Sequence, residues 1–177
     1  MNDMTTIDPY GEVIAPATIR IERLLPGPAS RVWDWLTKSE LRRQWLAAGD
    51  MDLTVGAPFE LVWRNDELNA TPSKRPDGFA EEDRMQSRIT ELDPGKTLSF
   101  VWGKDGEVTF RLKEVGPDIL LTIVHRRISD RPNLLGVSAG WHMHLDIMAA
   151  KLGGRKPDDF WSGWQRLRAE YETRIPA

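Results

Sequence analysis

The sequence has 177 residues, of which 40% are apolar and 29% charged, and this length and composition suit one globular domain. The formal net charge of -3 shows no basic excess, so we expect no nucleic-acid partner. Cysteine is absent, which excludes disulfides, thiolate metal sites and cysteine nucleophiles and favours a cytoplasmic location. No run approaches the roughly 18 consecutive apolar residues of a membrane span, so we expect no membrane insertion.

The N-terminal part of the chain divides into a leader and a first strand. Residues 1–17 contain acidic side chains and prolines but no apolar run of signal-peptide length, which predicts a flexible leader. Residues 18–25 then alternate as a strand does, with Ile19, Ile21 and Arg23 on one side. A Pro-Gly-Pro run ends this strand.

Two short helices, a strand and a long loop follow. Helical spacing begins at Ala29, and we expect Ser39 to cap a second short helix. A further strand is predicted at 59–64. The segment 65–83 is polar and shows no periodicity, which predicts a surface loop. Within it we expect 66–82 to be a mobile flap that a protease cuts first.

Four more strands are predicted in quick succession. Three or four residues rich in Gly, Asp and Pro separate each strand from the next. Links this short can join only antiparallel neighbours. The predicted ranges are 84–92, 97–102, 107–115 and 119–128.

The C-terminal part is predicted to be helical. Apolar side chains recur at helical spacing from residue 134 to Leu152, and a Gly-Gly pair ends this long helix. A second helix follows, with Asp158 or Asp159 as its N-cap. We therefore expect a domain over 18–152 and an additional helix within 153–177 that packs on the same domain.

The order of these elements is that of the helix-grip fold of START-like, or SRPBCC, domains. Within that superfamily the chain resembles the branch related to the activator of heat-shock-protein-90 ATPase. The segments that carry the resemblance are Ile19–Arg23, Pro28–Trp33, Leu41–Leu46, Gly56 with Phe59–Leu61, Ile89–Pro94, Leu121–His125 and Gly140–Trp141. The resemblance implies an α+β, Bet v-like fold in which a curved antiparallel sheet surrounds a long C-terminal helix.

The resemblance does not imply one activity, because the superfamily includes lipid carriers, aromatase-cyclases and chaperone activators. The first hypothesis is a domain whose main role is to bind a small hydrophobic molecule between sheet and helix, with or without weak chemistry on it. The second is a co-chaperone-like interaction module in stress response, with a chaperone or a second copy of the chain as partner. The third is an enzyme of the cyclase or aromatase type. A continuous cavity would favour the first hypothesis, and a packed interior with an exposed apolar patch would favour the second.

One motif suggests hydrolase chemistry but lies in the wrong context. Gly136, Ser138 and Gly140 match the G-x-S-x-G pattern, yet they fall inside the predicted helix, and no histidine follows His144. The two glycines would instead let the helix approach the sheet or leave space for a bulky neighbour. His142 and His144 point to nearly opposite helix faces and cannot share a metal ion. We expect no catalytic residue, no metal and no cofactor.

A set of large side chains is predicted to face the interior, and we expect it to border a ligand cavity. Strand alternation and helical phase place these residues between the concave face of the sheet and the long helix. His125 and His144 belong to the set, either as a structural pair or as part of the site. Arg88 is predicted to face outward. The candidate ligand-binding residues are Trp63, Trp102, His125, Trp141, His144, Leu61, Phe100, Ile123, Leu145 and Met148.

Overall fold

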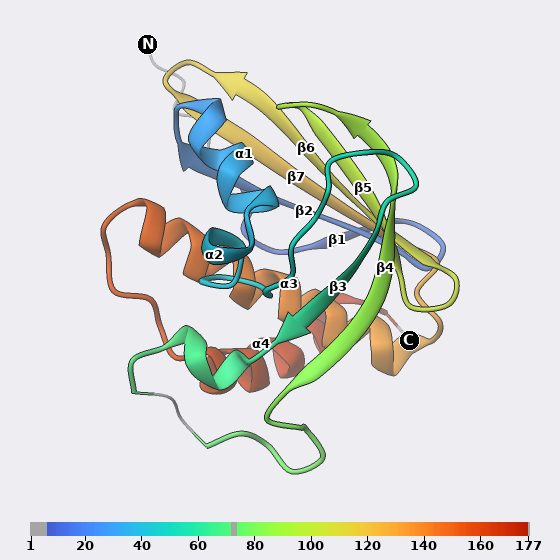
Figure 1. The fold of residues 1–177 in the computed structure, drawn as a ribbon. Helices are drawn as coiled ribbons and strands as arrows, with labels where there is room; N and C mark the ends of the chain where they lie inside the picture. Colours follow the sequence, from blue (N-terminus) through green and yellow to red (C-terminus); the bar gives the residue numbers. More distant parts are fainter. Residues whose placement is uncertain (1–6, 72–73, 177) are drawn as a thin grey trace.

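One antiparallel sheet organises the protein, whose computed structural model describes residues 7–71 and 74–176. Its seven strands lie in the order β1-β2-β7-β6-β5-β4-β3. The strands are β1 (Glu12–Ala15), β2 (Thr18–Pro26), β3 (Pro58–Trp63), β4 (Asp83–Asp93), β5 (Thr97–Trp102), β6 (Gly106–Val115) and β7 (Asp118–Arg126). Figure 1 shows the sheet curving over the C-terminal helices, with α1 (Ala29–Thr37) and α2 (Ser39–Arg42) at one end.

The core lies between the concave face of the sheet and helix α3 (Arg131–Leu152). Ile21 pairs with Ile123, and Ile123 pairs with Phe110, so these three side chains lie side by side across β2, β7 and β6. All three are buried. The alternation in the sequence therefore gives one apolar face, which α3 covers, and confirms the predicted α+β helix-grip fold.

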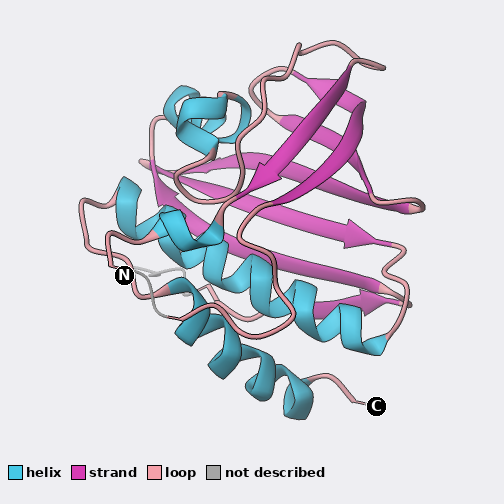
Figure 2. Cartoon of the chain, turned by 60° about the horizontal axis from the view of Figure 1, so that its bottom comes forward, coloured by secondary structure: helices cyan, strands magenta, loops and turns pink. Residues whose placement is uncertain are grey.

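The two C-terminal helices begin at acidic caps. Asp130 accepts a hydrogen bond from Asn133 N at 2.9 Å at the start of α3, and Asp159 accepts one from Ser162 N at 2.9 Å at the start of α4 (Phe160–Arg174). Helix α4 packs along α3 (Figure 2). No helix in residues 7–71 and 74–176 is long and apolar enough to cross a membrane.

The leader differs from its prediction. Glu12–Ala15 forms the edge strand β1, in which Glu12 pairs with Arg20. Gly11 N also donates a hydrogen bond to Tyr171 Oη at 2.7 Å, which ties the segment before β1 to α4. The alternation rule missed this strand because all four of its residues are exposed and give no inward face to detect.

The short helices also differ in detail. Ser39 does not cap α2, because its hydroxyl accepts a hydrogen bond from Gly49 N at 2.9 Å instead. Arg42, which is only 1% exposed, donates to the carbonyls of Thr37 and Ala47, each at 3.1 Å, and also to that of Gly49. Burial lowers the pKa of Arg42 to about 10, so the side chain stays charged at neutral pH and fixes the loop after α2.

Candidate functional site

A cavity of about 560 Å³ opens at one end of the sheet. The last residues of β3 and β5 and the first residues of β4 line it, because antiparallel neighbours bring these ends together. Helices α3 and α4 and residues 79–81 of the loop before β4 also contribute to the lining. We call this cavity the groove.

Three tryptophans form the side of the groove next to the sheet, and we call them the sheet-side wall. Trp63 ends β3, Trp102 ends β5, and Trp141 projects from α3. The rings of Trp63 and Trp102 lie 5.3 Å apart between centroids, and those of Trp102 and Trp141 lie 5.5 Å apart. Such tilted contacts are favourable, and the three rings form one apolar surface.

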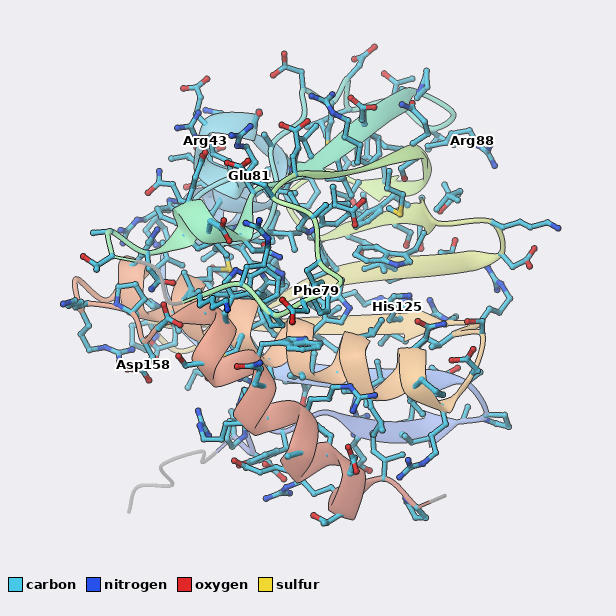
Figure 3. The ribbon with its side chains drawn as sticks, turned by 90° about the horizontal axis from the view of Figure 1, so that it is seen from below. Arg43, Phe79, Glu81, Arg88, His125 and Asp158 are labelled. Atoms are coloured by element: carbon cyan, nitrogen blue, oxygen red, sulfur yellow. The ribbon has the colours of Figure 1, made fainter. Side chains whose placement is uncertain are left out.

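Three other aromatic residues form the opposite side, which we call the helix-side wall. Phe79 lies 5.1 Å from both Trp161 and Trp164 between ring centroids, and the two tryptophan rings are 6.2 Å apart. Figure 3 shows Phe79 pointing from its loop toward the two C-terminal helices. This wall was not predicted from the sequence. Its signal was one phenylalanine in a polar loop and two tryptophans three residues apart in the last helix.

The glycines of the G-x-S-x-G match make room for this wall. Trp164 Nε1 donates to Gly136 O at 3.1 Å. An added Cβ would lie 3.8 Å from the Trp164 ring at Gly136 and 4.0 Å from it at Gly140. Of the two predicted roles, space for a bulky neighbour is therefore the one observed. Ser138 is buried and lies inside α3, so it forms no nucleophile elbow, which needs a strand-to-helix turn.

The loop after β3 is attached to α4 at several points. Asp66 Oδ1 accepts from Trp161 Nε1 at 2.7 Å, and Asn69 Oδ1 accepts from Phe160 N at 2.8 Å. Leu68, in the short 3-10 helix η1 (Asn65–Leu68), is buried. These anchors were not expected from the sequence, and the protease sensitivity of 66–82 stays a prediction.

His144 lines the groove in a fixed neutral state. Its Nδ1 lies 2.7 Å from the carbonyl oxygen of Trp45, which can only accept, so Nδ1 carries the hydrogen. Burial lowers the pKa of His144 to about 4, so the ring is neutral at pH 7. Its Nε2 is then a hydrogen-bond acceptor, and the residue lines the groove.

His125 has the opposite tautomer and lies outside the lining. Its Nδ1 accepts from Trp141 Nε1 at 3.1 Å, and burial lowers the pKa of His125 to about 4, so Nε2 carries the hydrogen. The His125 ring lies 4.9 Å from Trp102 between centroids. His125 therefore contacts two members of the sheet-side wall, Trp102 and Trp141, without lining the groove itself.

Four of the ten predicted site residues line the groove, namely Trp63, Trp102, Trp141 and His144. The other six are close-packed core residues: His125, Leu61, Phe100, Ile123, Leu145 and Met148. Their predicted faces are right, but α3 covers the middle of the sheet, and the groove lies at its end. The alternation of residues along a strand shows which face of the sheet a side chain lies on, but not whether the space beside it is filled by a helix.

The basic side chains at the groove form ion pairs, whereas two of its acidic side chains do not among the residues described. Arg84 forms ion pairs with Glu60 at 2.8 Å and Glu82 at 2.7 Å. Arg168 pairs with Glu172 at 3.1 Å. By contrast, no cation pairs with Glu81 or Asp83 within the part of the chain that the structure describes.

A different set of polar residues lies on another side of α3. Arg23, on the inward face of β2, binds Asp146 at 2.8 Å. His142 Nδ1 lies 2.9 Å from Tyr171 Oη, which in turn accepts from Gly11 N. We call these five residues the polar latch, because they join β2, α3, α4 and the N-terminal segment. His142 and His144 thus face different surroundings, as predicted, and the described residues hold no group of three metal-ligating side chains.

Comparison with known proteins gives the family. The family model described as Activator of Hsp90 ATPase homolog 1-like protein matches residues 26–153. A search of the curated proteins found no match.

Several solved structures are similar over nearly the whole chain. The protein encoded by BPP1335 of Bordetella parapertussis is 34% identical with a TM-score of 0.79, and the match covers 100% of this chain and 97% of that one. CalU16 of Micromonospora echinospora is 22% identical with a TM-score of 0.66, covering 90% and 89%. EF2215 of Enterococcus faecalis is 20% identical with a TM-score of 0.65, covering 92% and 90%. The chain therefore belongs to the Activator of Hsp90 ATPase homolog 1-like family of the SRPBCC superfamily.

Proposed function

We propose that this protein binds a small, mostly apolar molecule in the groove. The observation that carries the proposal is a cavity of about 560 Å³ between two aromatic walls. This volume lies within the range of roughly 300–1,000 Å³ that is usual for small-molecule sites. Apolar walls with few polar groups are also the usual lining of such sites.

The exposure of the walls favours binding over simple packing. Trp141 and Trp161 are buried, whereas Trp63, Trp102 and Trp164 are only partly covered and Phe79 is 44% exposed. Burying aromatic surface that is open to water lowers the free energy by roughly 25 cal/mol per Å² of apolar area. A flat apolar molecule between the walls would cover both at once.

The cavity criterion favours this function over a co-chaperone-like role. An interaction module is expected to have a filled interior and a continuous apolar patch on its surface. Here four partly exposed aromatic side chains, Trp63, Trp102, Trp164 and Phe79, gather in one recess, which suits a small molecule. We therefore base the proposed function on the cavity and not on the chaperone-related name of the family.

A neutral apolar dye, N-phenyl-1-naphthylamine, whose fluorescence rises on burial, tests the proposal. It should bind the wild type, and Trp102→Ala should weaken binding severalfold. Trp33→Ala is the matched control, because Trp33 is a half-buried tryptophan of α1 outside the groove. Gly140→Leu keeps every tryptophan but fills the space beside Trp164, and should abolish binding while the protein stays folded. Absence of dye binding to the wild type, or equal weakening by Trp33→Ala, would overturn the proposal.

A further inference from the structure

The unpaired charges of the groove are all negative. Glu81 and Asp83 line it, and no cation pairs with either among the residues described. The pairing Trp63 with Asp83 across β3 and β4 places the Asp83 carboxylate on the same sheet face as the Trp63 ring. The sheet-side wall therefore ends at a carboxylate that accepts a hydrogen bond from Arg84 N at 2.9 Å but has no counterion among the described residues.

The two arginines of the lining do not offset these carboxylates. Arg84 alternates with Asp83 and Met85 along β4, so its side chain belongs to the other sheet face, where it pairs with Glu60. Arg168 is held by Glu172, four residues along α4. An anionic ligand would find both guanidinium groups engaged and two carboxylates opposed to it.

From this pattern we infer that the natural ligand is an organic cation, with an aromatic or apolar body and a protonated amine or quaternary ammonium group. The inference rests on the proposed function, since it concerns the same groove. Indole faces attract cations through their quadrupole, and tryptophan does so most strongly. Five tryptophans on two facing walls offer such faces, namely Trp63, Trp102, Trp141, Trp161 and Trp164.

Two neutral groups of the groove also favour a donor on the ligand. His144 Nε2 is an acceptor, because Nδ1 carries the ring hydrogen. Asn65 Oδ1 is buried and has no hydrogen-bond partner among the described residues. A buried acceptor without a partner is costly, and an ammonium N–H or a hydroxyl of the ligand would satisfy it.

The wider charge distribution would steer a cation to the groove. Residues 60–84, which carry β3, the loop and the start of β4, contain seven acidic and four basic side chains. A cleft bordered by one sign of charge raises the local concentration of the opposite ion. This acidic segment borders the groove on the side that holds Glu81 and Asp83.

Three probes with the same naphthyl body test the inference by calorimetry: 2-naphthylmethyl-trimethylammonium, the neutral 2-naphthylmethanol and the anionic 2-naphthylacetate. The cation should bind the wild type about tenfold more tightly than the alcohol, and the anion should bind most weakly. Glu81→Gln with Asp83→Asn should bring the affinity of the cation close to that of the alcohol and leave the alcohol unchanged. Glu114→Gln with Asp93→Asn removes two exposed carboxylates outside the groove and should change neither affinity.

The outcomes separate the two proposals. If the alcohol binds and the cation binds no better, the inference fails and the proposed function stands. If the control pair weakens the cation as much as Glu81→Gln with Asp83→Asn, the preference reflects overall charge and the inference fails. If no probe binds, and N-phenyl-1-naphthylamine does not bind either, the proposed function itself fails.

Discussion

Helix α3 contributes to two regions of opposite character, the polar latch and the groove. In the latch, Arg23 is 7% exposed, and its guanidinium meets the Asp146 carboxylate and the carbonyls of Pro9 and Glu22. In the groove, Asn65 Oδ1 lacks a partner and two carboxylates lack cations in the described chain. The polar groups of the latch are paired with one another, whereas the groove keeps polar and charged groups that a ligand could bind.

The difference indicates what each region contributes. A fully partnered buried network stabilises one arrangement of the chain and offers nothing to a ligand. A buried acceptor left unpartnered, such as Asn65 Oδ1, costs stability, and that cost is recovered when a ligand supplies the missing donor. Changes in the latch should therefore alter stability alone, and changes in the groove should alter affinity as well.

The largest effect is expected for Trp141→Ala at the sheet-side wall. The free energy of unfolding should fall by about 3 kcal/mol, at the lower end of the usual cost of about 3–5 kcal/mol for removing a buried aromatic ring. The cost is low in that range because the ring borders open space, although His125 Nδ1 also loses its donor. Urea unfolding measures it, and a loss well above 5 kcal/mol would show that the groove is filled core in solution.

A smaller loss is expected for Asp146→Asn in the polar latch. Removing the charge leaves the Arg23 guanidinium buried without a counterion, which costs about 3–5 kcal/mol for a fully buried pair. Because the Asp146 side chain is 40% exposed, we expect about 2 kcal/mol. Lys38→Ala, which breaks the exposed pair with Asp34, is the control and should cost under about 0.5 kcal/mol. Dye affinity should not change, and equal losses in the two variants would show that the latch is not a stabilising network.

The sequence alone was sufficient for the fold but only for half of the groove. Strand β5 begins and ends where alternation predicts, at Thr97 and Trp102, because its inward side chains are large and either buried or partly buried. Strand alternation likewise found Trp63 and Trp102 of the sheet-side wall, and helical phase found Trp141. Phe79 was not, because its loop has no period and its partners Trp161 and Trp164 lie beyond the segments that resemble the family. Long-range contacts of this kind leave no local pattern.

Acid should destabilise both regions through their histidines. The pKa of His142 and that of His144 are each lowered to about 4, chiefly by burial. The unfolded chain therefore binds protons below about pH 6.5 while the folded protein does not, so the free energy of unfolding falls as the pH drops toward about 4, by up to about 1.4 kcal/mol per pH unit for each histidine.

The variant His144→Asn isolates the contribution of the groove histidine to the loss of stability in acid. Asparagine can still donate to the Trp45 carbonyl but cannot titrate, so the slope of unfolding free energy between pH 5 and 6 should decrease by up to about 1.4 kcal/mol per pH unit. His142, which faces Asp146 and Arg23, continues to titrate in this variant. An unchanged slope would mean that His144 takes up its proton in the folded state as readily as in the unfolded chain.

The smallest effect, and the one that separates stability from binding, is expected for Gly140→Ala. The new methyl would lie 4.0 Å from Trp164 Nε1, an ordinary contact, and alanine is favoured over glycine inside a helix by about 1 kcal/mol, so the variant should be slightly more stable than the wild type. The same methyl takes space from the groove and should weaken dye binding. Gly163→Ala on α4 is the matched change in packed surroundings, because its methyl would clash with Sδ of the buried Met143 and should destabilise the protein by about 1–3 kcal/mol. Thermal unfolding and dye titration of both variants decide the point: a stabilised Gly140→Ala protein that binds the dye as tightly as the wild type would place the ligand outside the groove.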